Sequence, residues 1–203
     1  EDRLAIAMPD ILRDVPGVPA NKRYGEESRL SIRGSGIGQG FHQRGVLIAE
    51  NGVSFADADG FSDFQKVDVL TARLVEVYKG GNALRFGGAQ LGGAVNLVTT
   101  NGRTTPSTVL LRAEGGSYDS WRGQAAAGGV IGKFDIYGSI NGYKADGYRE
   151  RSDSEQLRGT INLGYRLGED SEIRLIATAA TIEQGVPGTL TLAQTRANPR
   201  QAC

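Results

Sequence analysis

Hydrophobic and polar residues alternate with a period of two along much of the second half of the chain. In residues 155–167 one face carries Leu157, Gly159, Ile161, Leu163, Tyr165 and Leu167. The opposite face carries Gln156, Arg158, Thr160, Asn162, Gly164 and Arg166. The same alternation recurs in 133–145 and 172–182, and more weakly in 109–113 and 121–131. A period of two predicts β-strands, so this half should form an antiparallel sheet.

The connections between these strands differ in length from one side of the sheet to the other. Residues 168–170 make a short connection, whereas residues 146–154 make a longer, charged one. This pattern, with strands of about eleven residues or more, is typical of outer-membrane barrels. A soluble sheet with one wet face shows the same alternation, so periodicity leaves both open. About five strands are too few to close a barrel, and we expect them to belong to a larger sheet.

The first half of the chain has short apolar runs separated by glycine-rich connections. Residues 8–15 predict a short helix closed by Pro16 and Gly17. Asn51-Gly52 predicts a tight turn, and residues 82–84 a helical turn. The strands expected here are 30–33, 46–49, 74–78 and 94–99. We therefore expect an α+β domain in residues 1–103, followed by the antiparallel strands in 104–203.

Composition excludes several classes of protein. The 203 residues include 23 basic and 23 acidic side chains, so the net charge of zero argues against a nucleic-acid partner. The single cysteine, Cys203, cannot form an internal disulfide. No apolar run is long enough for a membrane-spanning helix.

The residues needed for catalysis or metal binding are largely missing. The glycine-rich run 34–40 does not fit G-x-G-x-x-G, and the sequence has no G-x-S-x-G elbow. One histidine, His42, and one cysteine offer no plausible nucleophilic pair or zinc cluster. We expect neither an enzyme, nor a cofactor, nor a resident metal.

Four motifs follow one another in order within residues 10–99. They are DILRDVPGV at 10–18, SIRG at 31–34, VLIAENGV at 46–53 and ARLVEVYKGGNALRFGGAQLGGAVNLVT at 72–99. Together they resemble the plug-domain motifs of TonB-dependent outer-membrane receptors of the siderophore-receptor type. The chain departs from that pattern at Gly81 (usually proline), Phe86 (usually tyrosine) and Asn51 (usually aspartate). Glycine and asparagine both tolerate turn geometry, so the backbone pattern is kept.

The resemblance implies a plug lodged in a barrel of about 22 strands in the bacterial outer membrane. Such a receptor binds a ferric siderophore or similar metal chelate and imports it into the periplasm with TonB-coupled energy. Its partners would be TonB, the ferric chelate and outer-membrane lipid. No Ton box is recognisable before Arg3, so TonB would grasp an N-terminal segment outside these residues. The alternatives are TonB-dependent uptake of cobalamin or glycans, or a soluble β-rich binding protein.

Three charged residues are candidates for a lock between plug and barrel. Arg33, Glu76 and Lys79 fall in or beside expected plug strands, where an unpaired buried charge would be costly. We expect Arg33 and Lys79 to meet carboxylates on the barrel wall and Glu76 to pair within the plug.

Ligand contacts should come from plug loops that face outward, at 21–26, 36–44 and 54–64. Their candidate residues offer rings and hydrogen-bonding groups: Tyr24, Phe41, His42, Gln43, Phe61 and Phe64. On the barrel strands the arginines predicted to face inward are Arg112, Arg122, Arg158, Arg166 and Arg174. A basic interior is compatible with an anionic chelate.

Overall fold

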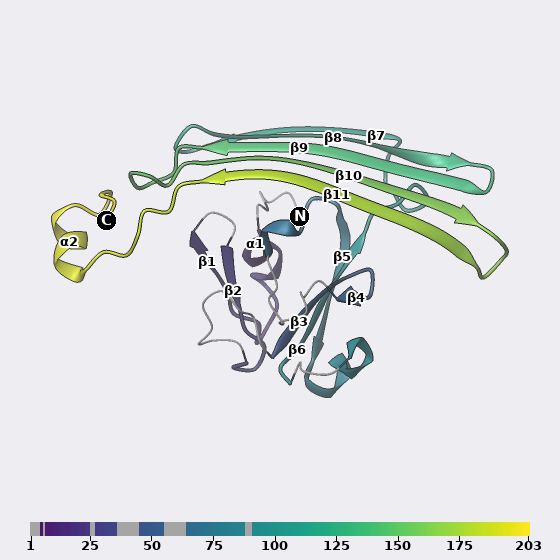
Figure 1. Cartoon of the computed structure of the whole chain (residues 1–203), viewed down its shortest axis with the longest axis horizontal. Helices are drawn as coiled ribbons and strands as arrows, with labels where there is room; N and C mark the ends of the chain where they lie inside the picture. The colour runs from purple at the N-terminus through teal and green to yellow at the C-terminus, as the bar shows by residue number, and fades with distance from the viewer. Residues whose placement is uncertain (1–4, 6, 25–26, 36–44, 55–63, 88–90) are drawn as a thin grey trace. The chain divides into compact units, whose positions relative to one another are not determined.

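The computed structural model describes residue 5 and residues 7–24, 27–35, 45–54, 64–87 and 91–203 (Figure 1). The chain divides into two compact units, Glu1–Thr99 and Thr100–Cys203. The division therefore falls between Thr99 and Thr100, slightly before the boundary expected at residue 103. Among the described residues, no helix is long and apolar enough to span a membrane.

The N-terminal unit combines a short helix with two small sheets. Helix α1 (Met8–Leu12) precedes a two-stranded antiparallel sheet of β1 (Ala20–Tyr24) and β2 (Glu27–Leu30). A second sheet has the order β4-β3-β6-β5. Its strands are β3 (Val46–Glu50), β4 (Val53–Ser54), β5 (Ala72–Lys79) and β6 (Gly93–Thr99), with the 3-10 helices η1 (Phe64–Lys66) and η2 (Gly80–Phe86) between them.

Strand β6 is the centre of this unit. It pairs with β3 in parallel and with β5 in antiparallel orientation, and nearly all of its residues are buried. The unit's core gathers around it, with Met8, Leu12, Leu30, Ile32, Ile48, Val95 and Leu97 each at most 1% exposed. A central strand covered on both faces has a continuous apolar sequence, which explains why GAVNLV shows no alternation.

Two expectations for the N-terminal unit are wrong. The strand expected at 30–33 ends at Leu30, because Arg33 (φ 53°) and Gly34 (φ 87°) adopt left-handed backbone and turn the chain. Residues 21–24, expected in a loop, belong to β1. The expected turn at Asn51-Gly52 is confirmed: both residues have positive φ, 51° and 85°, and join β3 to β4.

The second unit is a five-stranded antiparallel meander in sequence order. Its strands are β7 (Val109–Gly116), β8 (Ser120–Ile131), β9 (Phe134–Ala145), β10 (Ser154–Arg166) and β11 (Glu172–Gln184), followed by helix α2 (Leu192–Ala197). Residues 132–133 and 167–171 form the connections at one end, and 117–119 and 146–153 those at the other. All five strands expected from the alternation are present.

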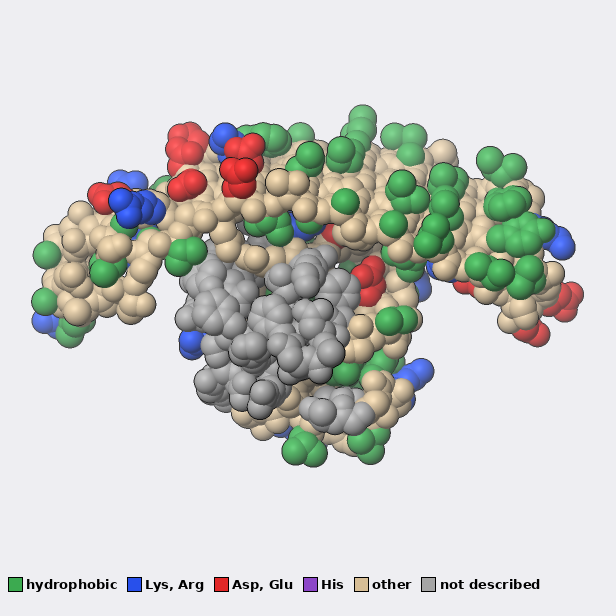
Figure 2. Space-filling model, in the orientation of Figure 1, with side chains coloured by type: hydrophobic (Ala, Val, Ile, Leu, Met, Phe, Trp, Pro, Cys, Tyr) green, Lys and Arg blue, Asp and Glu red, His purple; other side chains and the backbone are tan. Residues whose placement is uncertain are grey.

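The apolar face of this sheet is exposed. Leu157, Ile161 and Leu163 of β10 are 55%, 52% and 38% exposed, and Ile140 of β9 is 53% exposed. Figure 2 shows hydrophobic side chains spread over the visible surface of the sheet. A soluble protein rarely leaves so wide an apolar face uncovered, whereas a membrane barrel presents such a face to lipid.

Aromatic residues mark both ends of the apolar face. The rings of Phe134 and Tyr165 lie 4.5 Å apart at one end. At the other end Trp121 is paired in register with Lys144, whose ammonium lies 2.9 Å from the Glu155 carboxylate. Ten residues of β9 separate Phe134 from Lys144, about 34 Å along a strand and roughly 24 Å of height at a 45° tilt. That height matches the apolar band of about 25 Å in outer-membrane barrels.

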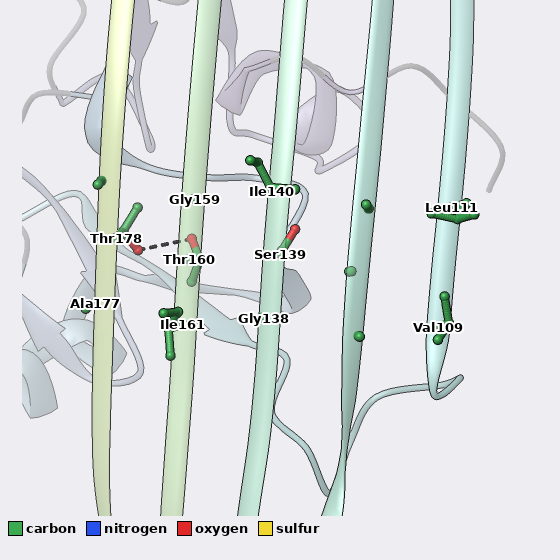
Figure 3. Close-up of a pocket in the computed structure, with 14 residues that line it drawn as sticks. Val109, Leu111, Gly138, Ser139, Ile140, Gly159, Thr160, Ile161, Ala177 and Thr178 are labelled. Atoms are coloured by element: carbon green, nitrogen blue, oxygen red, sulfur yellow. Dashed lines mark hydrogen bonds between the residues drawn. The ribbon is translucent and has the colours of Figure 1, made fainter.

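Between these ends the apolar face is hollowed by small residues. Gly138, Gly159 and the alanines of β8 and β11 leave a depression of about 670 Å³, bordered by Val109, Leu111, Ile140 and Ile161 (Figure 3). Its lining is mostly apolar. The depression is therefore part of the apolar face and offers few groups that could orient a polar ligand.

Because Ile161 lies near the middle of the apolar band, Ile161→Arg should destabilise the full-length protein in lipid vesicles by about 2–4 kcal/mol. Leu167→Arg is the matched control: Leu167 follows β10 at the edge of the band, where an arginine costs about 0–1 kcal/mol. Urea unfolding of both variants in vesicles measures the difference. Equal losses at the two positions would contradict a lipid-facing assignment.

Candidate functional site

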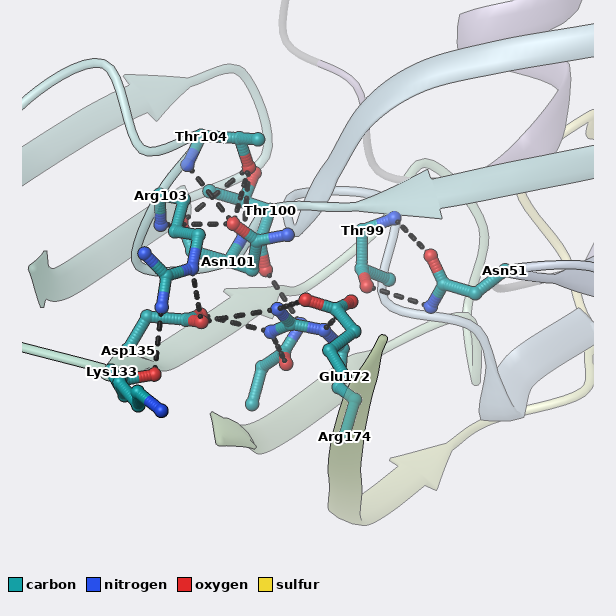
Figure 4. Close-up of polar contacts among 11 residues, drawn as sticks. Asn51, Thr99, Thr100, Asn101, Arg103, Thr104, Lys133, Asp135, Glu172 and Arg174 are labelled. Atoms are coloured by element: carbon teal, nitrogen blue, oxygen red, sulfur yellow. Dashed lines mark hydrogen bonds and ion pairs between the residues drawn. The ribbon is translucent and has the colours of Figure 1, made fainter. Parts of the chain in front are cut away.

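The last strand of the N-terminal unit is clamped at its end by Asn51. The Thr99 backbone N–H donates to Asn51 Oδ1 at 3.0 Å, and Asn51 Nδ2 donates to Thr99 Oγ1 at 2.8 Å (Figure 4). The Asn51 backbone N–H also donates to the Leu97 carbonyl at 2.8 Å. The left-handed turn at Asn51 thus brings one side chain onto both the backbone N–H and the hydroxyl of Thr99.

A second set of side-chain hydrogen bonds crosses the same sheet through Asn96. Its Nδ2 donates to Glu76 Oε2 at 2.7 Å, and its Oδ1 accepts from the Gly52 backbone N–H at 2.8 Å. Glu76, predicted to pair within the plug, therefore receives a hydrogen bond from the residue opposite it on β6. Buried amides need such partners, because an unsatisfied polar group costs about 1–3 kcal/mol.

Arg33 and Lys79 gather around Gly17 and Gly80. The Arg33 backbone donates to Gly17 O at 3.4 Å, and its guanidinium lies beside Gly80, 2.9 Å from where a β-carbon there would be. Lys79 Nζ donates to the Pro16 carbonyl. Within the described part of the N-terminal unit neither cation has a carboxylate partner. Both side chains therefore contact the backbone of the same two chain segments, around Gly17 and Gly80.

Most of the predicted ligand contacts lie where the structure gives no side-chain placement. Phe41, His42, Gln43 and Phe61 are outside the described residues, and only the backbone of Tyr24 is described, in β1. Phe64 is a correction: it is 5% exposed and belongs to the hydrophobic core. The 3-10 helix η1 turns this ring inward, so it cannot meet a ligand on the surface.

The chain leaves β6 through a connector, residues 100–105, that folds onto the polar face of the second unit. Asn101 Oδ1 accepts from the backbone N–H groups of Arg103 and Thr104 at 2.9 and 3.0 Å, and the Asn101 N–H donates to Thr104 Oγ1. Asparagine commonly closes turns in this way. The Thr100 carbonyl accepts from Asn162 Nδ2 of β10 at 3.0 Å.

Asp135 of β9 forms ion pairs with two arginines beside this connector (Figure 4). Arg103 Nε lies 2.9 Å from Asp135 Oδ2, and Arg103 Nη2 donates to the Lys133 carbonyl at 2.8 Å. Arg174 of β11 binds both oxygens of the same carboxylate, at 3.0 and 3.2 Å, and also pairs with Glu172. The Asp135 side chain is fully enclosed, with 0% exposed. A buried carboxylate is stable only when paired in this manner.

Sequence reasoning placed Arg174 on the inward face but did not find this network. Asp135 and Arg174 are both on the polar side of the alternation, yet their pairing depends on the register across β10, which places Gly164 between them. The sequence offered one signal for this pairing: Asp135 and Arg174 carry opposite charges at inward positions of strands that are two apart in the sheet.

A different group of charges lies on the polar face toward the longer connections. Glu114 lies 3.8 Å from Arg112 Nε and 3.6 Å from Arg122 Nη1. Arg158, in register with Asn141 across the sheet, donates to Gln156 Oε1 at 2.8 Å. These two neighbouring rows of side chains thus carry three arginines and one carboxylate.

The loop ends beyond these rows form a small cleft. Arg149 donates to the carbonyls of Pro187, Gly188 and Gln201 and so holds residues 187–201 against the β9–β10 loop. Tyr148 packs edge-on against Tyr118 at 5.8 Å and lies under Arg200 at 5.7 Å. The cleft beside them has a volume of about 360 Å³.

Comparison with known proteins agrees with this architecture. Residues 1–94 match the family described as TonB-dependent Receptor Plug Domain. The N-terminal unit therefore belongs to the TonB-dependent receptor plug domains. Members of this family are receptors and transporters of the bacterial outer membrane rather than enzymes. The N-terminal unit is accordingly the plug, and the five-stranded sheet is barrel wall.

Relatives are found both by sequence similarity and by similarity to solved structures. The vitamin B12 transporter BtuB of Vibrio cholerae (strain ATCC 39541) is 28% identical over 155 residues, covering 74% of this chain and 24% of that protein. The unliganded ferric citrate transporter FecA superposes with a TM-score of 0.78 at 20% identity, over 98% of this chain and 32% of that one. The ferric-catecholate import receptor Fiu of E. coli K12 gives 0.65 at 21% identity, over 88% and 25%. This chain thus spans a third or less of each relative's length.

Glu50 is the last residue of plug strand β3, and its carboxylate is partly buried. Partial burial, and to a lesser degree the nearby Asp68 carboxylate, raise its pKa above the usual 4.5. The folded plug therefore binds this proton more tightly than the unfolded chain does. The associated stability is complete below pH 4.5 and is lost as the pH rises through the folded-state pKa.

Glu50→Gln should remove this dependence and leave the plug more stable than wild type at pH 7, with the two converging near pH 4.5. Hydrogen exchange of β3 and β6 amides in the full-length receptor, corrected for intrinsic rates, measures the opening free energy. Asp68→Asn should act in the same direction but less, because Asp68 is the smaller cause. The assignment would be refuted if the wild-type plug became less stable when the pH is lowered from 7 and Glu50→Gln removed that loss.

Proposed function

We propose that this receptor binds a ferric siderophore or similar anionic metal chelate and imports it into the periplasm with energy supplied through TonB. The observation that carries the substrate class is the excess of arginine on the polar face: Arg112, Arg122 and Arg158 share two rows with the single carboxylate Glu114. Positive charge in a concave, partly dehydrated space attracts anions. The likeness of the fold to ferric citrate and ferric-catecholate receptors is consistent with this proposal.

Cobalamin is the second candidate, favoured by a separate observation. The curated relatives at 27–28% identity are vitamin B12 transporters. A corrinoid presents mostly amide groups rather than carboxylates to its receptor, so arginines would contribute less to its binding. The response of binding to arginine removal therefore separates the two candidates.

Calorimetric titration of the full-length receptor in detergent, with a panel of ferric siderophores, ferric citrate and cobalamin, tests the proposal. Replacing Arg122 and Arg158 together by glutamine should weaken binding of the ferric chelate about tenfold, through the loss of positive potential rather than of direct contacts, because the two side chains are only 3% and 4% exposed.

Arg166→Gln is the matched control, because Arg166 lies exposed at the end of β10. Tight binding of cobalamin that is indifferent to the arginine changes would move the assignment to the second candidate. Binding of neither class would refute both.

We propose further that Arg33 and Lys79 lock the plug by meeting carboxylates of the barrel wall, as the resemblance implied. Their proximity, without a carboxylate partner among the described plug residues, supports this role. The double change Arg33→Ala, Lys79→Ala should raise the leak conductance of the receptor in planar bilayers. Arg73→Ala removes an exposed plug arginine on β5 and should not. Unchanged conductance in the double variant would contradict the lock.

A further inference from the structure

The plug and the wall take hold of the chain on opposite sides of one peptide bond. Thr99 is held by Asn51 of the plug, through its N–H and its hydroxyl. The carbonyl of the next residue, Thr100, is held by Asn162 of the wall at 3.0 Å. Side-chain hydrogen bonds on either side therefore mark the point at which the plug ends and the wall begins.

The two holds differ in strength. The clamp on Thr99 consists of neutral hydrogen bonds of 2.8 and 3.0 Å. The connector is held by the Arg103–Asp135 ion pair of 2.9 Å and by the Arg103 bond to the Lys133 carbonyl. Hydrogen bonds with an ionised partner are roughly twice as strong as neutral ones, which applies to the bond from the Arg103 guanidinium to the Lys133 carbonyl. The charge-assisted contact of the junction therefore lies on the wall side.

Two glycines make the stronger hold possible. A β-carbon at Gly102 would lie 2.3 Å from the Gly129 carbonyl oxygen, so the connector runs directly on the backbone of the wall. A β-carbon at Gly164 would lie 2.4 Å from Asp135 Oδ2 and 2.6 Å from Arg174 Nη2. Only glycine at that position lets the ion pair between β9 and β11 pass over β10.

We propose that Arg103, Asp135 and Arg174 form a staple that fixes the connector to the barrel wall, with Asp135 as the positioning residue. The proposal rests on the TonB-coupled transport proposed above, because a fixed end matters only when the plug is pulled. Force that enters the plug from its N-terminal side opens the plug sheet up to Thr99 and stops there. The plug stays tied to one point on the wall, from which it can refold.

Single-molecule pulling on the N-terminal side of the plug, with the full-length receptor in a lipid bilayer, tests this. In wild type the released length should end at Thr99. In Arg103→Gln the connector should also detach, up to the start of β7 at Val109. Residues 100–108 would add about 30 Å, at about 3.3–3.6 Å per residue. A role in barrel stability alone would not change this length.

Hydrogen exchange without force gives a second measurement. In Arg103→Gln the amides of residues 100–105 should exchange about tenfold faster or more, while β9 and β11 keep their protection because Asp135 remains bound to Arg174. Arg166→Gln should change neither measurement. Asn51→Ala should lower the force of the last plug event without adding length, because it weakens only the plug side.

An Arg103→Gln receptor with wild-type released length and wild-type exchange would overturn the staple. If that variant does not fold, Gly164→Ala provides the same test, because its β-carbon displaces the Asp135 carboxylate. The pulling force comes from the instrument, so the outcome does not depend on TonB. A wild-type receptor that imports no chelate would refute the proposed function and leave the staple result intact.

Discussion

The wall of this receptor depends on one constraint: successive side chains of a strand point to opposite faces. Strands β7–β11 use it to present an apolar face that is exposed and a polar face whose groups must find partners. The partners come from neighbouring strands, as in the pairs Gln124–Ser139 and Thr160–Thr178. Where charge rather than hydroxyl or amide is enclosed, the same requirement produces the Asp135 network.

The polar face divides into two regions of different charge balance. Near the short connections, Asp135 and Glu172 balance Arg103 and Arg174, and that region is closed by its own ion pairs. Toward the longer connections, arginine exceeds carboxylate. The first region is suited to holding the chain in place, and the second to attracting an anion. In the functions proposed here, one sheet face serves both anchoring and substrate attraction, and the two roles use different charges.

The plug illustrates how a motif and its geometry can differ. Residues 30–33, which overlap the SIRG motif, were expected to form a strand. Ser31 and Ile32 are buried. Arg33 and Gly34, however, turn the chain and bring the guanidinium to Gly80. Phe64 was expected at the surface because the loop 54–64 was expected to face outward, yet a single 3-10 turn places its ring in the core. Local propensity does not record which way a short turn aims a ring.

The sequence alone determined the strands of the wall, the tight turn at Asn51-Gly52 and the resemblance to plug domains, because a period of two and turn residues are local properties of the chain. Only the tertiary structure decided that the apolar face is exposed, that Asn51 clamps Thr99, and that Arg103 and Arg174 share Asp135. These residues are distant in sequence, and the register between strands brings them together. A shift of two residues in that register would keep Asp135 on the polar face but separate it from Arg174, and the alternation within an individual strand does not exclude such a shift.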